Sequence, residues 1–519
     1  MKKTIAKNTG IISIGTNISR VLGLVRDVLI AKFFGTGYEA AAFVVAFTIP
    51  NMLRDFVGEG AANAAFVPVL TEYRIHKTKQ EFWELANIIF IALSAVLAVI
   101  TFVGVFAAPL IVKIIAPGFI NEPGAITLTI NLTRIIFPYI LLVGLTAYSM
   151  GILNTLGHFF APSFSPVLLN LSLILSAIFL CPIFGIKALA FGVLIGGVLQ
   201  LVLQLPFLLN RGFRPKLVFN LKHPAVKKIG TLLVPRIIGG AVYQINIIID
   251  RMLASLYWIV GQGGIPALYY SYRLIQYPLA IFSTALATAV LPIMAGHATK
   301  NRNHDIKDTL IFSLRMIFFI LIPASIGFMV LGKPIIKILF QRGAFDVNSL
   351  NITYNALLFY SFGLFAYGGI RILATTFYSM NDTATPVKIA AISLAINLDF
   401  KLILMKPLKI GGLALATSIA ACFNFFALFF FLKKKIKTLH FSILIRPLAK
   451  IISSSAVMGV VCFFTLNHFT SYIDAGNLLT KSAYLCFIIF CSMATYFIAT
   501  FLFKIEETRK ILKWILRRK

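Results

Sequence analysis

Apolar residues in this chain run in long stretches, and short polar connections separate them. A helix of about 20 apolar residues matches the hydrocarbon thickness of a bilayer. The pattern therefore predicts an all-α polytopic membrane protein with about 14 transmembrane helices. The predicted spans are residues 10–34, 40–73, 86–111, 125–156, 161–182, 186–210, 228–256, 264–296, 309–332, 350–380, 384–405, 409–432, 447–468 and 481–503.

Composition supports a membrane protein and argues against a soluble one. Hydrophobic residues make up 59% of the chain and charged residues only 13%, whereas soluble domains carry about 25% charged residues. The net charge of +31 would suggest nucleic acid in a soluble protein, but the basic residues cluster in short loops between apolar runs. The five cysteines lie in apolar stretches without metal-ligand spacing. We therefore expect no nucleic-acid partner, no metal and no cofactor.

The loop lysines and arginines predict the orientation. With the N-terminus inside, most of them fall in the connections on the inner side, including the run Lys433–Lys437 and the basic C-terminal tail. The positive-inside rule then places both termini in the cytoplasm. Arg20 and Arg26 interrupt the first apolar run and no small-residue cleavage site follows it, so we interpret this run as a retained span.

The chain also repeats itself at an offset of 224 residues. The pair Arg26-Asp27 falls on Asp250-Arg251 in reversed order. One offset that holds across six spans is typical of an internal duplication. It also pairs Pro68 with Pro292, Lys113 with Lys337, Pro162 with Pro386, and Ile186, Leu189, Ala190 and Ile195 with Ile410, Leu413, Ala414 and Ile419.

Six spans per repeat is an even number, so the halves have the same orientation in the membrane. This parallel arrangement occurs in transporters whose substrate site lies near the repeat interface. We predict an N-terminal lobe at 1–212, a C-terminal lobe at 213–437, and two unrepeated spans with a basic tail at 438–519.

Arginines lie inside the predicted spans, where each costs roughly 2.5–3.5 kcal/mol if it faces lipid. They are Arg20, Arg26, Arg54 and Arg273. On a helix Arg20 and Asp27 share a face, and Arg26 lies about 100° around from Asp27. We expect these side chains to face water or an anion.

Further polar residues accompany these arginines. Prolines flank the centre of the second span, where Arg54, Asp55 and Glu59 lie, and Tyr269, Arg273 and Gln276 form one stripe in the eighth span. Arginines in and near the spans outnumber the neighbouring acids, which favours an anionic ligand. The alternatives are that the arginines only neutralise Asp27, Asp55, Glu59 and Asp250 in buried pairs, and that the tyrosines only pack or mark the interface.

Three segments carry a resemblance to a known family: SRVLGLVRDVLIAKFFGTG (19–37), FTIPNMLRDFVGEGAANAAFVPVLTEY (47–73) and ALYYSYRLIQYPLAIFSTALATAVLP (267–292). Through them the chain resembles the MurJ/MviN family of bacterial lipid II flippases over essentially its whole length. This family belongs to the multidrug/oligosaccharidyl-lipid/polysaccharide exporter superfamily. The resemblance implies a non-enzymatic protein of the bacterial inner membrane that moves the undecaprenyl-pyrophosphate-linked peptidoglycan precursor, lipid II, from the cytoplasmic to the periplasmic leaflet.

The resemblance also implies an architecture and a site. Two six-helix lobes would surround a cationic cavity, and spans 13 and 14 would form a groove for the lipid tail. The family's essential arginines correspond to Arg20, Arg26, Arg54 and Arg273, with acidic partners at Asp27 and Glu59. Tyr269, Gln276, Asp250 and Arg251 complete our candidate substrate-binding set. Two family carboxylates are absent, at Ala41 and at Tyr272, which bears on ion coupling.

The expected partners are lipid II and anionic membrane lipids, with the membrane potential or an ion gradient as energy source. No Walker A sequence is present. Alternatives are an exporter of another polyprenyl-linked oligosaccharide, such as O-antigen, and a multidrug exporter, although the latter would need an acidic cavity. A polyprenyl-phosphate enzyme is disfavoured because the seven histidines are scattered.

Overall fold

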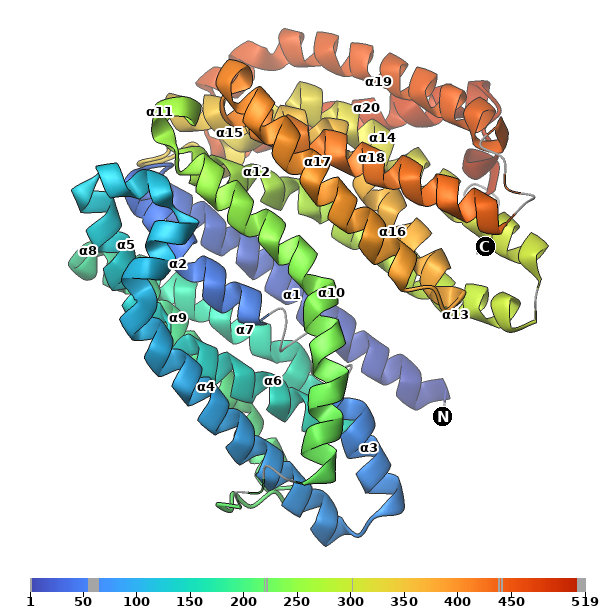
Figure 1. The fold of residues 1–519 in the computed structure, drawn as a ribbon. Coiled ribbons are helices and arrows are strands. Elements are labelled where there is room, and N and C mark those ends of the chain that lie inside the picture. Colours follow the sequence, from blue (N-terminus) through green and yellow to red (C-terminus); the bar gives the residue numbers. More distant parts are fainter. Residues whose placement is uncertain are drawn as a thin grey trace. The chain divides into compact units, whose positions relative to one another are not determined.

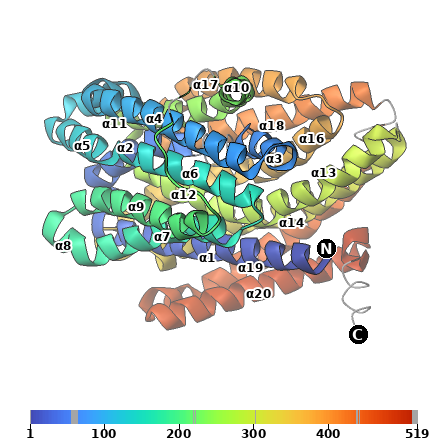
Figure 2. The same cartoon turned by 90° about the horizontal axis from the view of Figure 1, so that it is seen from below.

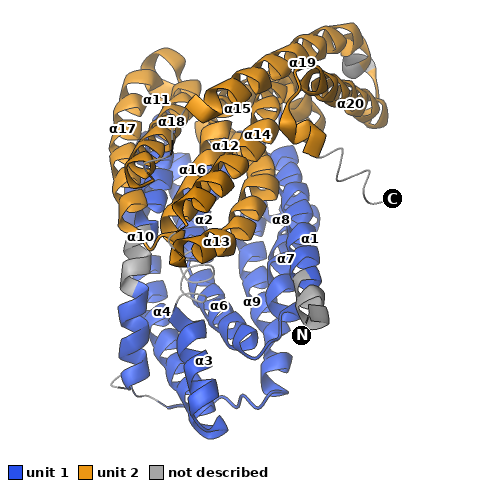
Figure 3. Ribbon diagram, turned by 90° about the vertical axis from the view of Figure 1, so that its right-hand side faces the viewer, with its two compact units in different colours: residues 1–257, 342–345 blue, residues 258–341, 346–519 orange. Residues whose placement is uncertain are grey.

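The computed structural model describes residues 2–54, 65–218, 220, 223–300, 302–436, 439 and 442–510, and it contains helices and no strand within these ranges. Contacts divide the chain into two compact units (Figure 3). Unit 1 comprises residues 1–257 and 342–345, and unit 2 comprises 258–341 and 346–519. The predicted lobes at 1–212, 213–437 and 438–519 follow from the repeat rather than from compactness, so they stay a prediction.

Unit 1 holds the elements from α1 to α10 (Figure 1). They are α1 (Lys2–Phe34), α2 (Tyr38–Arg54), α3 (Val67–His76), α4 (Lys79–Ile115), η2 (Pro117–Asn121), α5 (Pro123–Ile136), α6 (Tyr139–Thr155), α7 (Phe160–Leu175), η3 (Ser176–Leu180), α8 (Cys181–Phe184), α9 (Lys187–Leu209) and α10 (Pro224–Ala254).

Unit 2 holds the remaining elements after α11 (Tyr257–Val260), which begins at the boundary between the units. They are α12 (Gly264–Pro278), η4 (Leu279–Ser283), α13 (Thr284–Thr299), α14 (Asn303–Phe340), α15 (Val347–Phe362), α16 (Leu364–Ser379), α17 (Ala384–Leu408), α18 (Ile410–Lys435), α19 (Ser442–Ala475) and α20 (Leu478–Leu502).

The all-α membrane fold is confirmed. Within the described ranges, nine helices are long and apolar enough to cross a membrane, or ten if α15 and α16, bent by 46°, form one span. The predicted spans outside this set correspond to α1, α2 with α3, α10 and α17, and all four carry charges near their middle or end. Polar residues lower the hydropathy of such helices, so composition alone does not reach the predicted total of fourteen, which stays a prediction.

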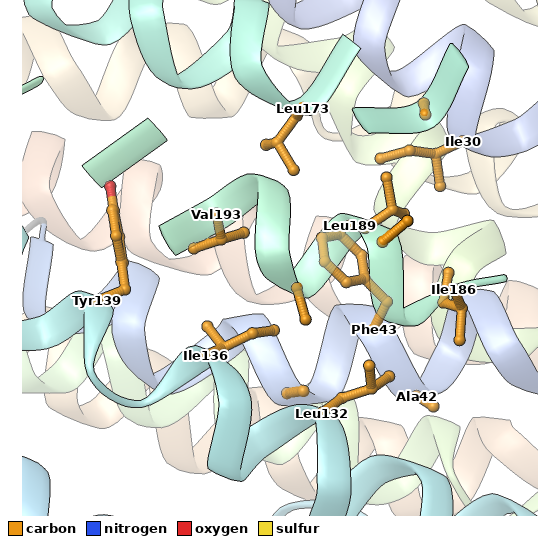
Figure 4. Packing of buried hydrophobic residues seen from close by; sticks show 14 of the residues in the cluster. Ile30, Ala42, Phe43, Leu132, Ile136, Tyr139, Leu173, Ile186, Leu189 and Val193 are labelled. Atoms are coloured by element: carbon orange, nitrogen blue, oxygen red, sulfur yellow. The ribbon is translucent and has the colours of Figure 1, made fainter. Parts of the chain in front are cut away.

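One apolar core in unit 1 positions the charged part of α1. Ile30 of α1, Phe43 of α2, Ile136 of α5 and Leu173 of α7 pack together with residues of α9 (Figure 4). Each comes from an apolar run, and the helices bury one face of that run against the others. The core therefore fixes α1 against α7 one turn beyond Arg26 and Asp27.

A short segment of the later chain also belongs to unit 1. The N–H of Ala344 donates to the carbonyl of Lys32 at 2.8 Å. Gly35 ends α1 with φ +55°, and a Cβ at this position would collide with the backbone of Ala344. Glycine is required here for both reasons.

In unit 2 the two unrepeated helices pack on α14. Leu331 and Ile338 of α14 contact Cys462 of α19 and Leu485 and Ile488 of α20 in one apolar cluster. The antiparallel pair α19 and α20 lies side by side in Figures 1 and 2. Spans 13 and 14 are thus a helix hairpin attached to α14.

Candidate functional site

Arg26 and Asp27 form a buried ion pair in α1. Arg26 is 6% exposed and Asp27 0%, and the guanidinium donates to Oδ1 of Asp27 from Nε at 3.0 Å and from Nη2 at 2.7 Å. Adjacent residues on a helix point about 100° apart, so the long arginine side chain turns back toward the short aspartate. The internal pairing that the sequence left as an alternative is therefore present for Arg26.

A residue of α7 completes this cluster. Nη1 of Arg26 donates to Oδ1 of Asn170 at 3.0 Å, and Nδ2 of Asn170 donates to the Ser19 carbonyl at 2.9 Å and to Ser19 Oγ at 3.1 Å. Asn170 is 8% exposed. The carboxylate neutralises the guanidinium, and the amide links both of them to the neighbouring helix.

The other candidates of unit 1 lie on three helices. Arg20 is half-buried on α1, six residues before Arg26, and Arg54 is half-buried as the last residue of α2. Asp250 and Arg251 are half-buried near the end of α10. Glu59, like Asp55, lies outside the described residues.

The candidates of unit 2 lie together on α12. Tyr269, Arg273 and Gln276 are all half-buried, and Nη1 of Arg273 donates to Oε1 of Gln276 at 3.3 Å. Their neighbour Tyr270 is buried and packs on Phe340 of α14. These three polar side chains therefore lie beside the packed face of α12 and not on it.

The pairing of Arg26 changes where a surplus of positive charge can arise. Asp27 already compensates Arg26, and a neutral pair attracts an anion less than an uncompensated guanidinium does. The excess of arginine over acid that the sequence indicates therefore owes less to Arg26 than the charge of its side chain alone suggests.

Sequence reasoning did not identify four buried polar residues, Asn170 on α7 and three residues on α17. Asn170 is the only amide side chain in the apolar run of α7, which was its one visible signal. On α17, Ser393, Asn397 and Lys401 follow at intervals of four and are 5%, 3% and 0% exposed, whereas Asp399 is exposed. A spacing of two residues places Asp399 and Lys401 on different faces of the helix.

Arg315 has a structural partner. It forms ion pairs with Glu507 at 2.5 Å and with Glu506 at 3.2 Å, both in the segment after α20. Tyr496 of α20 also donates to the carbonyl of Phe319 at 2.7 Å. These contacts attach the end of the hairpin to α14, so Arg315 has a structural role.

Ion pairs also lie in the connections. Lys435, within the basic run after α18, pairs with Asp382 at 2.6 Å. Burial raises the pKa of Asp382, but hydrogen bonds from Lys435 and from both the N–H and the hydroxyl of Thr385 outweigh it and lower the pKa to about 2. Within the described residues no group of three or more His, Cys, Asp or Glu side chains is arranged to hold a metal.

Comparison with known proteins supplies the family. A family model described as lipid II flippase MurJ matches residues 30–484. A probable lipid II flippase MurJ of Vibrio cholerae is 38% identical over 82% of each chain. One of Buchnera aphidicola subsp. Acyrthosiphon pisum is 35% identical over 93% of this chain and 94% of its own.

Solved structures agree on the fold. The inward closed conformation of a lipid II flippase MurJ superposes with a TM-score of 0.80 at 30% identity, over 95% of this chain and 98% of that one. An inward-facing MATE family transporter of the MOP superfamily gives a TM-score of 0.68 over 81% of this chain and 96% of its own. At 16% identity this second likeness shows a shared fold alone. With a family model that spans most of the sequence and relatives matched along most of their length, the chain belongs to the lipid II flippase MurJ family.

Proposed function

We propose that this protein is a lipid II flippase of the bacterial cytoplasmic membrane, which moves the undecaprenyl-pyrophosphate-linked precursor from the cytoplasmic to the periplasmic leaflet. The observation that carries the proposal is the match to the flippase family over residues 30–484. Both termini lie in the cytoplasm in this proposal, because the loop lysines and arginines are concentrated on that side.

The proposed headgroup ligands are the guanidinium groups of Arg20, Arg26, Arg54 and Arg273, together with the side chains of Tyr269 and Gln276. Arginine binds phosphate oxygens through paired charge-assisted hydrogen bonds. Asp27, Glu59, Asp250 and Arg251 set the local charge, and the half-buried positions of Arg20, Arg54 and Arg273 suit a site that takes up an anion.

The polyprenyl tail stays in lipid while the headgroup crosses by alternating access. A cationic site makes the loaded carrier nearly neutral, so the cycle exports about two negative charges. At about 150 mV, negative inside, this is favourable by roughly 7 kcal/mol. The membrane potential or an ion gradient is then a sufficient energy source without ATP.

Anionic lipids are the second proposed partner. Lysines near the cytoplasmic ends of spans attract acidic headgroups by about 1 kcal/mol each. Lys433 and Lys434 at the end of α18 are exposed, whereas Lys435 is already paired with Asp382. The first two are the stronger candidates for lipid contact.

Complementation tests the function. A bacterium depleted of its own flippase should resume wall synthesis when it expresses this chain. Arg273→Ala and Arg26→Ala should each abolish the rescue while the protein still inserts into the membrane at normal abundance. Normal rescue by both variants would refute the arginine model.

Complementation of other strains separates the alternative functions. A strain that lacks only its exporter for another polyprenyl-linked oligosaccharide would be rescued if that oligosaccharide were the substrate. A multidrug exporter would instead confer resistance without restoring the wall. We expect rescue of the lipid II-dependent strain only.

A further inference from the structure

Asn170 is the one amide of α7, and it is buried at 8% exposure. Its neighbour Leu169 is buried in the cluster formed with α2, α5 and α9. A buried amide is costly unless its donors and acceptor are satisfied. Its oxygen and nitrogen both bond to α1, on Arg26 and on Ser19.

The orientation of this amide follows from the chemistry of its partners. Arginine has only donors, so the atom that faces Nη1 of Arg26 must be the amide oxygen. The Ser19 carbonyl only accepts, so the atom that faces it must be the amide nitrogen. A flipped amide would lose both bonds, and an aspartate at this position could make only the first.

Asn170 also restrains the orientation of the Arg26 guanidinium, which the ion pair with Asp27 restrains only weakly. Nε and Nη2 of Arg26 both donate to a single oxygen of Asp27. One oxygen restrains the guanidinium at one point, whereas the bond from Nη1 to Asn170 restrains a second edge from another helix. Together they fix the plane of the guanidinium.

The helices that carry this cluster are in close contact a few turns away. A Cβ at Gly15 would lie 2.7 Å from the carbonyl oxygen of Ser163, so α1 and α7 approach with no side chain between them. This backbone contact sets the distance over which the amide reaches α1. The position of the Arg26 charge is thereby tied to the packing of the two helices.

We propose that Asn170 is a positioning residue for transport: it holds the guanidinium of Arg26, and with it the charge of the Arg26–Asp27 pair, in the orientation that headgroup transfer requires. The proposal depends on the proposed function, since it gives Asn170 its role through Arg26. Nothing in the family match or in the resemblance assigns this residue.

The test compares a substitution that keeps the size of the Asn170 side chain but changes its bonding with one that removes the amide. Asn170→Asp removes the donor to Ser19 and adds a negative charge, so wall synthesis in the depleted strain should fall about tenfold or more. Asn170→Ala should lower it severalfold. Asn131→Ala, the same deletion at an exposed position of α5, should stay within about twofold of the original chain.

A charge exchange separates positioning from simple packing. In the double variant Asp27→Asn with Asn170→Asp, Arg26 again faces one carboxylate and one amide, with their places exchanged. The rate of wall synthesis with the double variant should exceed the rate with either single variant at matched membrane abundance. If the substitutions only disturbed packing, the double variant would instead show the combined loss of both single variants.

The outcomes are distinguishable. If the unmodified chain fails to restore wall synthesis, the proposed function falls and this inference with it. If the unmodified chain restores it and Asn170→Asp does so equally well, the inference alone is wrong. A double variant no better than its single variants also overturns it.

Discussion

The guanidinium groups of Arg26, which is buried, and Arg315, which is half-buried, are compensated in different ways. Arg26 pairs with the adjacent residue of its own helix, and a neutral amide makes the link to α7. Arg315 pairs with Glu507, 192 residues further along the chain. In the first cluster the carboxylate balances charge and the amide joins helices, whereas in the second the carboxylate does both.

The surroundings of the two pairs differ as well. Both partners of the Arg26 pair are nearly inaccessible, with side-chain exposures of 7% and 0%. Beside Arg315 a cavity of about 260 Å³ is lined by Lys307, Asp308 and Lys510, and Asp308 and Lys510 are more than half exposed. Water can therefore solvate a broken pair at Arg315 more readily than one at Arg26.

The largest expected effect is at Asp27. Asp27→Asn removes the carboxylate that pairs with the buried Arg26, and the loss of one partner of a buried pair costs about 3–5 kcal/mol. We expect low membrane abundance and a strongly lowered midpoint of thermal unfolding in detergent. An unfolding midpoint equal to that of the original chain would show that Asp27 is not the counter-ion on which α1 depends.

Removing the carboxylate of Glu507 should have a smaller effect. Glu507→Gln keeps the shape, Glu506 still lies 3.2 Å from Arg315, and water is near, so we expect a loss of about 1–3 kcal/mol. The segment after α20 should become more sensitive to protease than the helices are.

Glu506 supplies the matched control for that experiment. It is 62% exposed on its side chain, so Glu506→Gln should change the unfolding midpoint very little. Equal sensitivity to protease in both variants would mean that Glu507 does not anchor the segment.

The close packing of α1 against α7, the two helices that carry Arg26 and Asn170, can be tested separately at two glycines of α1. Gly15→Ala places a methyl group against the backbone of Ser163, and overpacking of this kind costs about 1–3 kcal/mol. At Gly10 a Cβ would meet nothing within 4 Å, so Gly10→Ala should be neutral or slightly stabilising. A ranking in the other order would contradict a close approach of α1 and α7.

These cases show which features can be predicted from local sequence. The apolar runs predicted the helices well, because burial in lipid is decided by about 20 consecutive residues. Arg26 and Asp27 were also recognised locally, because charged residues within an apolar run of this length stand out as a polar face. Their pairing was one of two open alternatives, since a helical wheel places adjacent residues apart and does not show how far a long side chain can turn.

Long-range partners were beyond such reasoning. Asn170 and Arg26 are separated by 144 residues, and nothing local to α7 points to α1. Lys401 is fully buried while Asp399 is exposed, a difference that depends on which helices surround α17. Gly10 and Gly15 cannot be distinguished from the sequence, and only the packing of α7 against Gly15 makes them different.

The smallest expected effect concerns a third ion pair, which is neither deeply buried nor inside a span. Asp382 pairs with Lys435, and its pKa of about 2 lies below the roughly 3.9 of an unfolded chain. A lowered carboxylate pKa contributes stability above the unfolded value, and this contribution is lost as the pH falls through the folded value. Because Lys435 is 41% exposed, solvent screening limits the effect to about 1 kcal/mol.

The unfolding midpoint of the original chain should thus approach that of Asp382→Asn between about pH 4 and pH 2, and the two midpoints should differ by a constant amount above pH 5. A difference that grows on acidification would show that Asp382 is not the carboxylate whose charge stabilises this connection.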